Sequence, residues 1–97
     1  MNPPPHRHGA TLLIQRLAEH LAHDGAPHPV TGALALAVRG RSGVDRAAFA
    51  REVALSIETL TLVESGQLPL DDLPPVISER IPLLGVDLDA LAPHGAF

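Results

Sequence analysis

The sequence predicts a single all-α domain, and three observations lead to this fold class. Hydrophobic residues make up 45% of the 97 residues but aromatic residues only 2%. The core must therefore be built from Leu, Ile, Val and Ala, which favours helices over a β-sandwich. Apolar residues recur at helical spacing, and no alternating segment is bounded by hairpin turns. The length suits one modest core.

The N-terminal quarter is expected to contain an arm and one helix. Residues 1–9 include three consecutive prolines, so we expect a disordered or extended arm. Residues 10–25 form an amphipathic helix that stops at Gly25, and the linker "APHP" follows. The apolar face of this helix carries Leu13, Ile14, Leu17, Ala18 and Leu21.

Capping residues mark the next three helices. Thr31 is the expected N-cap of a helix that runs through "GALALAVR" and ends at "GRSG". Asp45 caps a helix of about residues 46–54. After a turn at Leu55, Ser56 caps a helix of about residues 57–65. Gly66 then ends that helix in the left-handed conformation.

Prolines organise the C-terminal third. We expect Asp71 or Asp72 to cap a fifth helix whose first turn contains Pro74 and Pro75. Pro82 should kink or end it near Ile81. A last short helix within "GVDLDALA" is capped by Asp87, and residues 93–97 form a tail.

The rotation of the 57–65 helix decides which of its side chains are available for recognition. At about 100° per residue, one side faces the preceding helix. That side carries Ser56, Thr59, Leu60 and Val63, which we expect to dock on Phe49, Ala50 and Val53. The opposite side presents Ile57, Glu58, Thr61, Leu62 and Ser65.

The stretch "GVDRAAFAREVALSIETLTLVESGQLP", with "LDDL" and "LLGVDLDAL" downstream, resembles the phage-repressor or Cro-like (XRE-type) helix-turn-helix family. Residues 43–50 match the family pattern that opens the motif, and residues 54–56 match its turn. Residues 63–66 match the end of its reading helix, and residues 84–91 match its closing helix. The resemblance covers roughly residues 31–92. It implies a five-helix bundle that binds operator DNA as a dimer, with the 10–25 helix as an addition.

The resemblance also suggests residue roles. Arg46 occupies the position of a phosphate contact, and Ile57, Glu58, Thr61 and Leu62 occupy positions that read base edges. Glu58 can accept a hydrogen bond from cytosine N4, and Ile57 or Leu62 can touch a thymine methyl group. The candidate nucleic-acid contacts are Arg39, Arg41, Arg46, Arg51, Ser56, Ile57, Glu58, Thr59, Thr61, Leu62 and Ser65.

Charge is distributed unevenly along the chain, which has a net charge of −4. Residues 39–51 contain four arginines and one aspartate, a net charge of +3, whereas residues 52–97 contain one arginine and eight acidic residues, a net charge of −7. The basic segment predicts a phosphate-binding patch. Four arginines would limit the salt dependence of DNA binding to a slope of about −4 per module, so we expect a dimer to be needed.

Two functions remain open. The first is a small DNA-binding transcriptional regulator that acts as a dimer. The second is a protein-interaction module on the same scaffold. In it, Ile57, Leu62 and the acidic half of the chain bind a toxin, a sigma factor or a larger regulator. Because the five-helix core should be complete without the 10–25 helix, we expect Leu13, Leu17 and Leu21 to form the dimer interface. The alternative is that this helix packs on its own bundle.

Other classes of function lack support in the sequence. No nucleophile–base pair, phosphate loop or carboxylate pair stands in a catalytic context, so we expect neither an enzyme nor a cofactor. The chain has no cysteine, and His20 and His23 lack further ligands at suitable spacing, so no metal site is expected. Without an apolar run of membrane-spanning length or a signal peptide, a cytoplasmic protein is expected.

Overall fold

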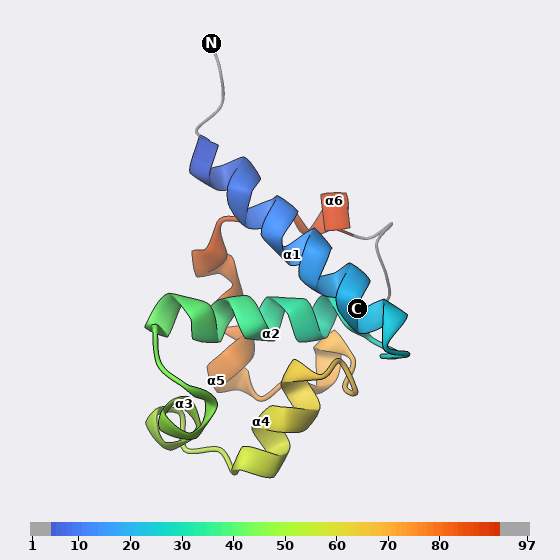
Figure 1. The fold of residues 1–97 in the computed structure, drawn as a ribbon. Helices are drawn as coiled ribbons and strands as arrows, with labels where there is room; N and C mark the ends of the chain where they lie inside the picture. Colours follow the sequence, from blue (N-terminus) through green and yellow to red (C-terminus); the bar gives the residue numbers. More distant parts are fainter. Residues whose placement is uncertain (1–4, 92–97) are drawn as a thin grey trace.

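The computed structural model describes residues 5–91, and its side chains from residue 10 onward. Every regular element in this range is helical, which confirms the expected all-α fold class (Figure 1). The elements are α1 (Pro5–His23), α2 (Pro29–Ser42), α3 (Arg46–Glu52), α4 (Ile57–Glu64), η1 (Leu70–Asp72), α5 (Pro75–Ser78), η2 (Ile81–Leu84) and α6 (Leu88–Leu91).

Helix α2 is the centre of the fold, and the other elements pack around it. Helix α1 lies diagonally across it, and this pair makes the most extensive contact between any two elements (Figure 1). Helix α4 and η2 also pack on α2. Almost every residue in the N-terminal half of α2 is buried, which explains why this segment reads as a nearly unbroken apolar run.

Helix α1 belongs to the core, contrary to the expectation of a core complete without it. Ile14 and Ala18 are fully buried, and Leu17 and Leu21 are half-buried against the same cluster. Leu13, which shares the predicted apolar face, stays exposed. The apolar stripe of this helix is therefore used mainly within the monomer.

The start of α1 also differs from the sequence prediction. Its backbone is helical from Pro5, so the expected extended arm is wrong for residues 5–9, while residues 1–4 lie outside the described residues. The physical reason is that a proline fits the first turn of a helix, where its missing amide hydrogen is not needed. Only prolines deeper inside a helix break it.

The predicted cap of α2 is wrong for a similar reason. The helix starts at Pro29 with His28 in the N-cap position, and no side chain makes a capping hydrogen bond. Thr31 is instead fully buried in the helix, and its Oγ1 has no hydrogen-bond partner among the described residues. The fixed φ of Pro29 starts the helix before the expected cap is reached.

The C-terminal third is more broken than predicted. A single helix ending near Ile81 was expected, but η1, α5 and η2 take its place. Asp71 and Asp72 lie in η1 and cap nothing. Pro74 is extended (ψ 137°) because Pro75 follows it, so the helix can begin only at Pro75. Pro82 is the second residue of η2 instead of the end of a helix.

Two glycines allow α2 to approach the end of α4. A Cβ atom at Gly32 would lie 2.7 Å from the backbone nitrogen of Gly66 and 2.8 Å from Cδ1 of Leu21. Gly66 adopts a left-handed φ of 75°, as predicted, and its carbonyl accepts a 2.9 Å hydrogen bond from the His28 amide. This contact holds α1, α2 and the segment just after α4 together.

We predict that Gly32→Ala lowers the free energy of unfolding by about 2–3 kcal/mol, because backbone atoms must move to admit the methyl group. Gly40→Ala in the same helix is the control, since nothing lies within 4 Å of its Cβ position. It should raise the free energy of unfolding by about 0.5–1 kcal/mol through helix propensity. Urea titration followed by circular dichroism measures both, and equal effects would contradict the close approach.

Candidate nucleic-acid interface

Helices α3 and α4 are joined by a short turn, and both are capped at their N-termini as predicted. The Asp45 carboxylate accepts a 2.8 Å hydrogen bond from the Ala48 amide at the start of α3. At the start of α4, Ser56 Oγ accepts a 3.1 Å hydrogen bond from the Thr59 amide. These caps satisfy amide hydrogens that have no partner inside the helix. They fix where each helix begins.

The turn between the helices has a conformation that the sequence did not signal. The Leu55 amide donates to the Ala50 carbonyl at 2.9 Å, and the Ala54 amide donates to the Arg51 carbonyl at 3.3 Å. This pair of bonds is a Schellman motif, which needs a left-handed residue at its centre. That residue is Ala54, with a φ of 58°, the only non-glycine residue with positive φ among the described residues.

Replacing Ala54 with glycine should therefore stabilise the protein. A left-handed φ strains alanine by about 1–2 kcal/mol, whereas glycine adopts it freely at some entropic cost. We expect Ala54→Gly to raise the free energy of unfolding by about 0.5–1 kcal/mol. The matched control is Ala47→Gly within α3, which should lower the free energy of unfolding by about 1 kcal/mol. A loss of stability in both variants would contradict the strained turn.

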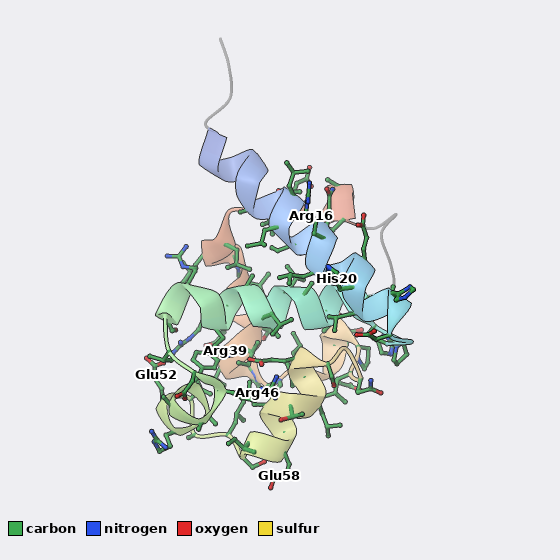
Figure 2. The ribbon with its side chains drawn as sticks, viewed as in Figure 1. Arg16, His20, Arg39, Arg46, Glu52 and Glu58 are labelled. Atoms are coloured by element: carbon green, nitrogen blue, oxygen red, sulfur yellow. The ribbon has the colours of Figure 1, made fainter. Side chains whose placement is uncertain are left out.

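The predicted rotation of α4 is correct for its aliphatic residues, but Ser56, which was expected to dock on α3, is exposed. Leu60 and Val63 are fully buried, whereas Ile57 and Leu62 are 46% and 49% exposed. Glu58 and Thr61 are also exposed. Figure 2 shows Glu58 at the outer end of α4, pointing away from the molecule. Ser56 is exposed as well, whereas Thr59 and Ser65 are half-buried.

Two hydroxyl groups on the outer side, one in α4 and one at its C-cap, donate their hydrogens within the protein. Thr61 Oγ1 donates to the Ile57 carbonyl at 2.7 Å, and Ser65 Oγ donates to the Leu62 carbonyl at 3.2 Å. Their lone pairs remain available as acceptors. Together with the Glu58 carboxylate and the two aliphatic side chains, the outer surface of α4 presents acceptors and apolar groups, but few donors.

Two of the four candidate phosphate-binding arginines are paired with one buried carboxylate. The Arg39 Nε lies 2.7 Å from Glu64 Oε2, and the Arg46 Nε lies 3.0 Å from Glu64 Oε1. The Glu64 side chain is fully buried, while those of Arg39 and Arg46 are 24% and 42% exposed. In Figure 2 both arginines reach into the space that α2, α3 and α4 enclose.

The pairing of Glu64 was not predicted from the sequence, although a signal was present. Glu64 follows Leu60 by four residues, so it shares the inward side of α4. A carboxylate on a buried side needs a positive partner, because burying an unpaired charge is very unfavourable. The excess of arginine in residues 39–51 supplies two such partners.

The ion pairs should contribute strongly to stability. Glu64→Ala removes the carboxylate that joins the last turn of α2 to the start of α3, and we expect a loss of about 3 kcal/mol in the free energy of unfolding. Glu58→Ala on the exposed side of the same helix should change it by no more than about 0.5 kcal/mol. Urea unfolding of both variants measures the difference, and similar losses would show that Glu64 is not the link.

The other two arginines lie apart from Glu64. Arg41 donates a hydrogen bond to the Leu83 carbonyl in η2. Arg51 is exposed and has no hydrogen bond or ion pair with the described residues. The four arginines therefore do not form one continuous patch of unpaired charge, and Arg51 is the one with the fewest internal contacts.

The predicted partner interface on α1 is divided between the core and the surface. Leu13 and Leu17 line an apolar groove of about 440 Å³ between α1 and α2, whereas Leu21 packs beside Gly32.

Within the described residues, no group of three or more histidine, aspartate or glutamate side chains is placed to hold a metal ion. None of the described helices combines the length and apolar character that crossing a membrane requires.

No family model, curated protein or solved structure matches the chain. The function must therefore be inferred from the arrangement of α3 and α4 and from the chemistry of the exposed face of α4.

Proposed function

We propose that this protein is a small regulator that binds duplex DNA through the helix-turn-helix of α3 and α4. The observation that supports the proposal most directly is the orientation of α4. Leu60 and Val63 anchor it inward, and its opposite face is exposed between capped ends. A helix presented in this way fits the width of the major groove. The resemblance of the sequence to Cro-like domains supports the same function.

The chemistry of the exposed face suggests which bases it would contact. Ile57 and Leu62 suit thymine methyl groups, and Glu58 suits the amino group of cytosine. The free lone pairs of Thr61 suit the same kind of donor. Guanine offers acceptors in the major groove and would find no arginine on this helix. The proposed target is therefore rich in thymine methyl groups and exposed amino groups.

Phosphate contacts would come from α3. Arg51 is exposed, and Arg46 keeps N–H groups that Glu64 does not engage. The charge of Glu64 offsets one of the four arginines in residues 39–51. We therefore expect no more than about three phosphate contacts and a salt slope near −3 per module. Two modules acting as a homodimer would double the slope, so the proposal includes a second copy on the DNA.

A second candidate function has specific support. Two aliphatic side chains, each nearly half exposed, lie beside hydroxyl groups whose hydrogens are already bonded within the protein. Toward a partner, these hydroxyl groups can act only as acceptors. Such a surface also suits a protein segment that combines apolar residues with lysine or arginine donors. In this case α4 binds a protein partner, and affinity for DNA is weak or absent.

The two functions are separated by measuring the binding of random duplex DNA by fluorescence anisotropy at several salt concentrations. Under the first function, the wild type binds at low salt, and Arg51→Gln weakens binding and lowers the salt slope by about 1. Arg16→Gln is the charge-matched control, since Arg16 is an exposed arginine on α1, far from α4 (Figure 2). It should leave the slope unchanged.

Absence of binding at the lowest salt would reject the DNA-binding function. Equal losses in both variants would mean that only net charge matters, and would also reject recognition by the helix-turn-helix. The second function predicts that a photo-crosslinking residue at position 62 captures a protein partner, whereas the same residue at position 12 does not. Leu12 is exposed to a similar degree, at 54%. Capture from both positions would contradict it.

A further inference from the structure

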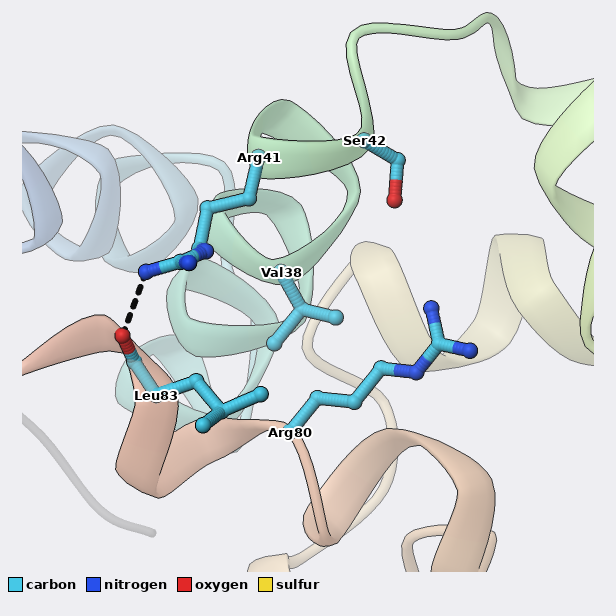
Figure 3. A pocket seen from close by; sticks show the side chains of 5 residues that line it. All are labelled: Val38, Arg41, Ser42, Arg80 and Leu83. Atoms are coloured by element: carbon cyan, nitrogen blue, oxygen red, sulfur yellow. Dashed lines mark hydrogen bonds between the residues drawn. The ribbon is translucent and has the colours of Figure 1, made fainter.

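We propose that a hollow between the end of α2 and η2 binds a small organic anion that carries an acidic group at each end. The hollow has a volume of about 380 Å³, which is in the range of pockets that hold small molecules. It is lined by Val38, Arg41, Ser42, Arg80 and Leu83 (Figure 3). This site is separate from the outer face of α4 and does not depend on DNA binding.

The first argument is charge. Arg41 and Arg80 both line the hollow, and neither pairs with a carboxylate among the described residues, whose two ion pairs both involve Glu64. Glu79 precedes Arg80 in the chain, but it is exposed and makes no ion pair with it. In a chain with a net charge of −4, two uncompensated guanidinium groups at one hollow create a local preference for anions.

The second argument is that both arginine side chains are already held in place. Arg41 donates one hydrogen bond to the Leu83 carbonyl. The guanidinium carbon of Arg80 lies 5.7 Å from the centre of the Phe49 ring, which is fully buried and cannot move aside. Because a guanidinium has five N–H donors, both groups keep donors for a ligand. Restricting the free protein reduces the entropy lost on binding.

The third argument concerns the shape of the ligand. In Figure 3 the two guanidinium groups extend to opposite sides of Val38, and the Ser42 hydroxyl lies on the same side as the Arg80 guanidinium. Val38 and Leu83 supply an apolar wall between the charged ends. A complementary ligand therefore has two acidic groups joined by an apolar spacer. A straight-chain dicarboxylate is the simplest molecule of this class.

The proposal is tested by titrating the full chain with straight-chain dicarboxylates from succinate to suberate. Each is compared with the monocarboxylate of the same length. Binding is followed by calorimetry and by the NMR signals of the arginine Nε–H groups. We expect one chain length to bind about tenfold more tightly than its monocarboxylate, because only it engages both arginines. Arg41→Gln and Arg80→Gln should each remove this advantage, whereas Arg16→Gln should keep it.

Arg80→Lys is included because Arg80→Gln also removes the contact with Phe49. The lysine variant keeps the positive charge but loses the planar guanidinium, which can make two parallel hydrogen bonds to a carboxylate. It should therefore retain part of the preference for the dicarboxylate. Equal affinity for mono- and dicarboxylates would overturn the proposal. So would a loss of the dicarboxylate preference in Arg16→Gln as large as the loss in Arg41→Gln or Arg80→Gln. It would also be overturned if duplex DNA shifted the Arg41 and Arg80 signals and no dicarboxylate did. Failure of DNA binding in the anisotropy experiment leaves these outcomes unaffected.

Discussion

The carboxylate of Glu64 is the constraint on which the arrangement of α2, α3 and α4 depends. It is fully buried and hydrogen-bonds with Arg39 from α2 and Arg46 from α3. Apolar packing is not directional, so it would allow α4 to rotate or slide by a fraction of a turn. A buried carboxylate cannot leave its two partners without a large penalty, and it therefore fixes the end of α4 against both other helices. Together with the buried Leu60 and Val63, this link holds α4 so that Ile57 and Leu62 face outward.

The same link shapes the recognition chemistry. Arg39 and Arg46 hold the scaffold together, so only part of their charge and hydrogen-bonding capacity remains for a ligand. The hydroxyl hydrogens of Thr61 and Ser65 are also bonded within the helix. Under either proposed function, binding by α4 would therefore rest on shape, on apolar contacts and on hydrogen-bond acceptors. Such a surface discriminates between partners well but attracts polyanions weakly.

Features set by a few neighbouring residues could be predicted from the sequence, and features set by distant contacts could not. Asp45, Ser56 and Gly66 act within one turn of their own positions, so their roles were correctly predicted. The inward side of α4 follows from helical periodicity alone. The burial of α1 on α2 and the pairing of Glu64 depend on residues about ten or more positions away. Arg80 was missed because no local pattern relates it to Phe49 or Arg41.

Helix α2 connects the features that matter most for function. Its N-terminal half meets Gly66 through Gly32, which ties α1 to the end of α4. Its last turn carries both Arg39 and Arg41. Arg39 holds Glu64, and Arg41 lines the hollow beside η2. These two arginines share one helical turn, so an anion bound in the hollow would contact the same turn that carries Arg39. One helical turn of α2 therefore supplies both a partner of the buried carboxylate and a wall of the hollow.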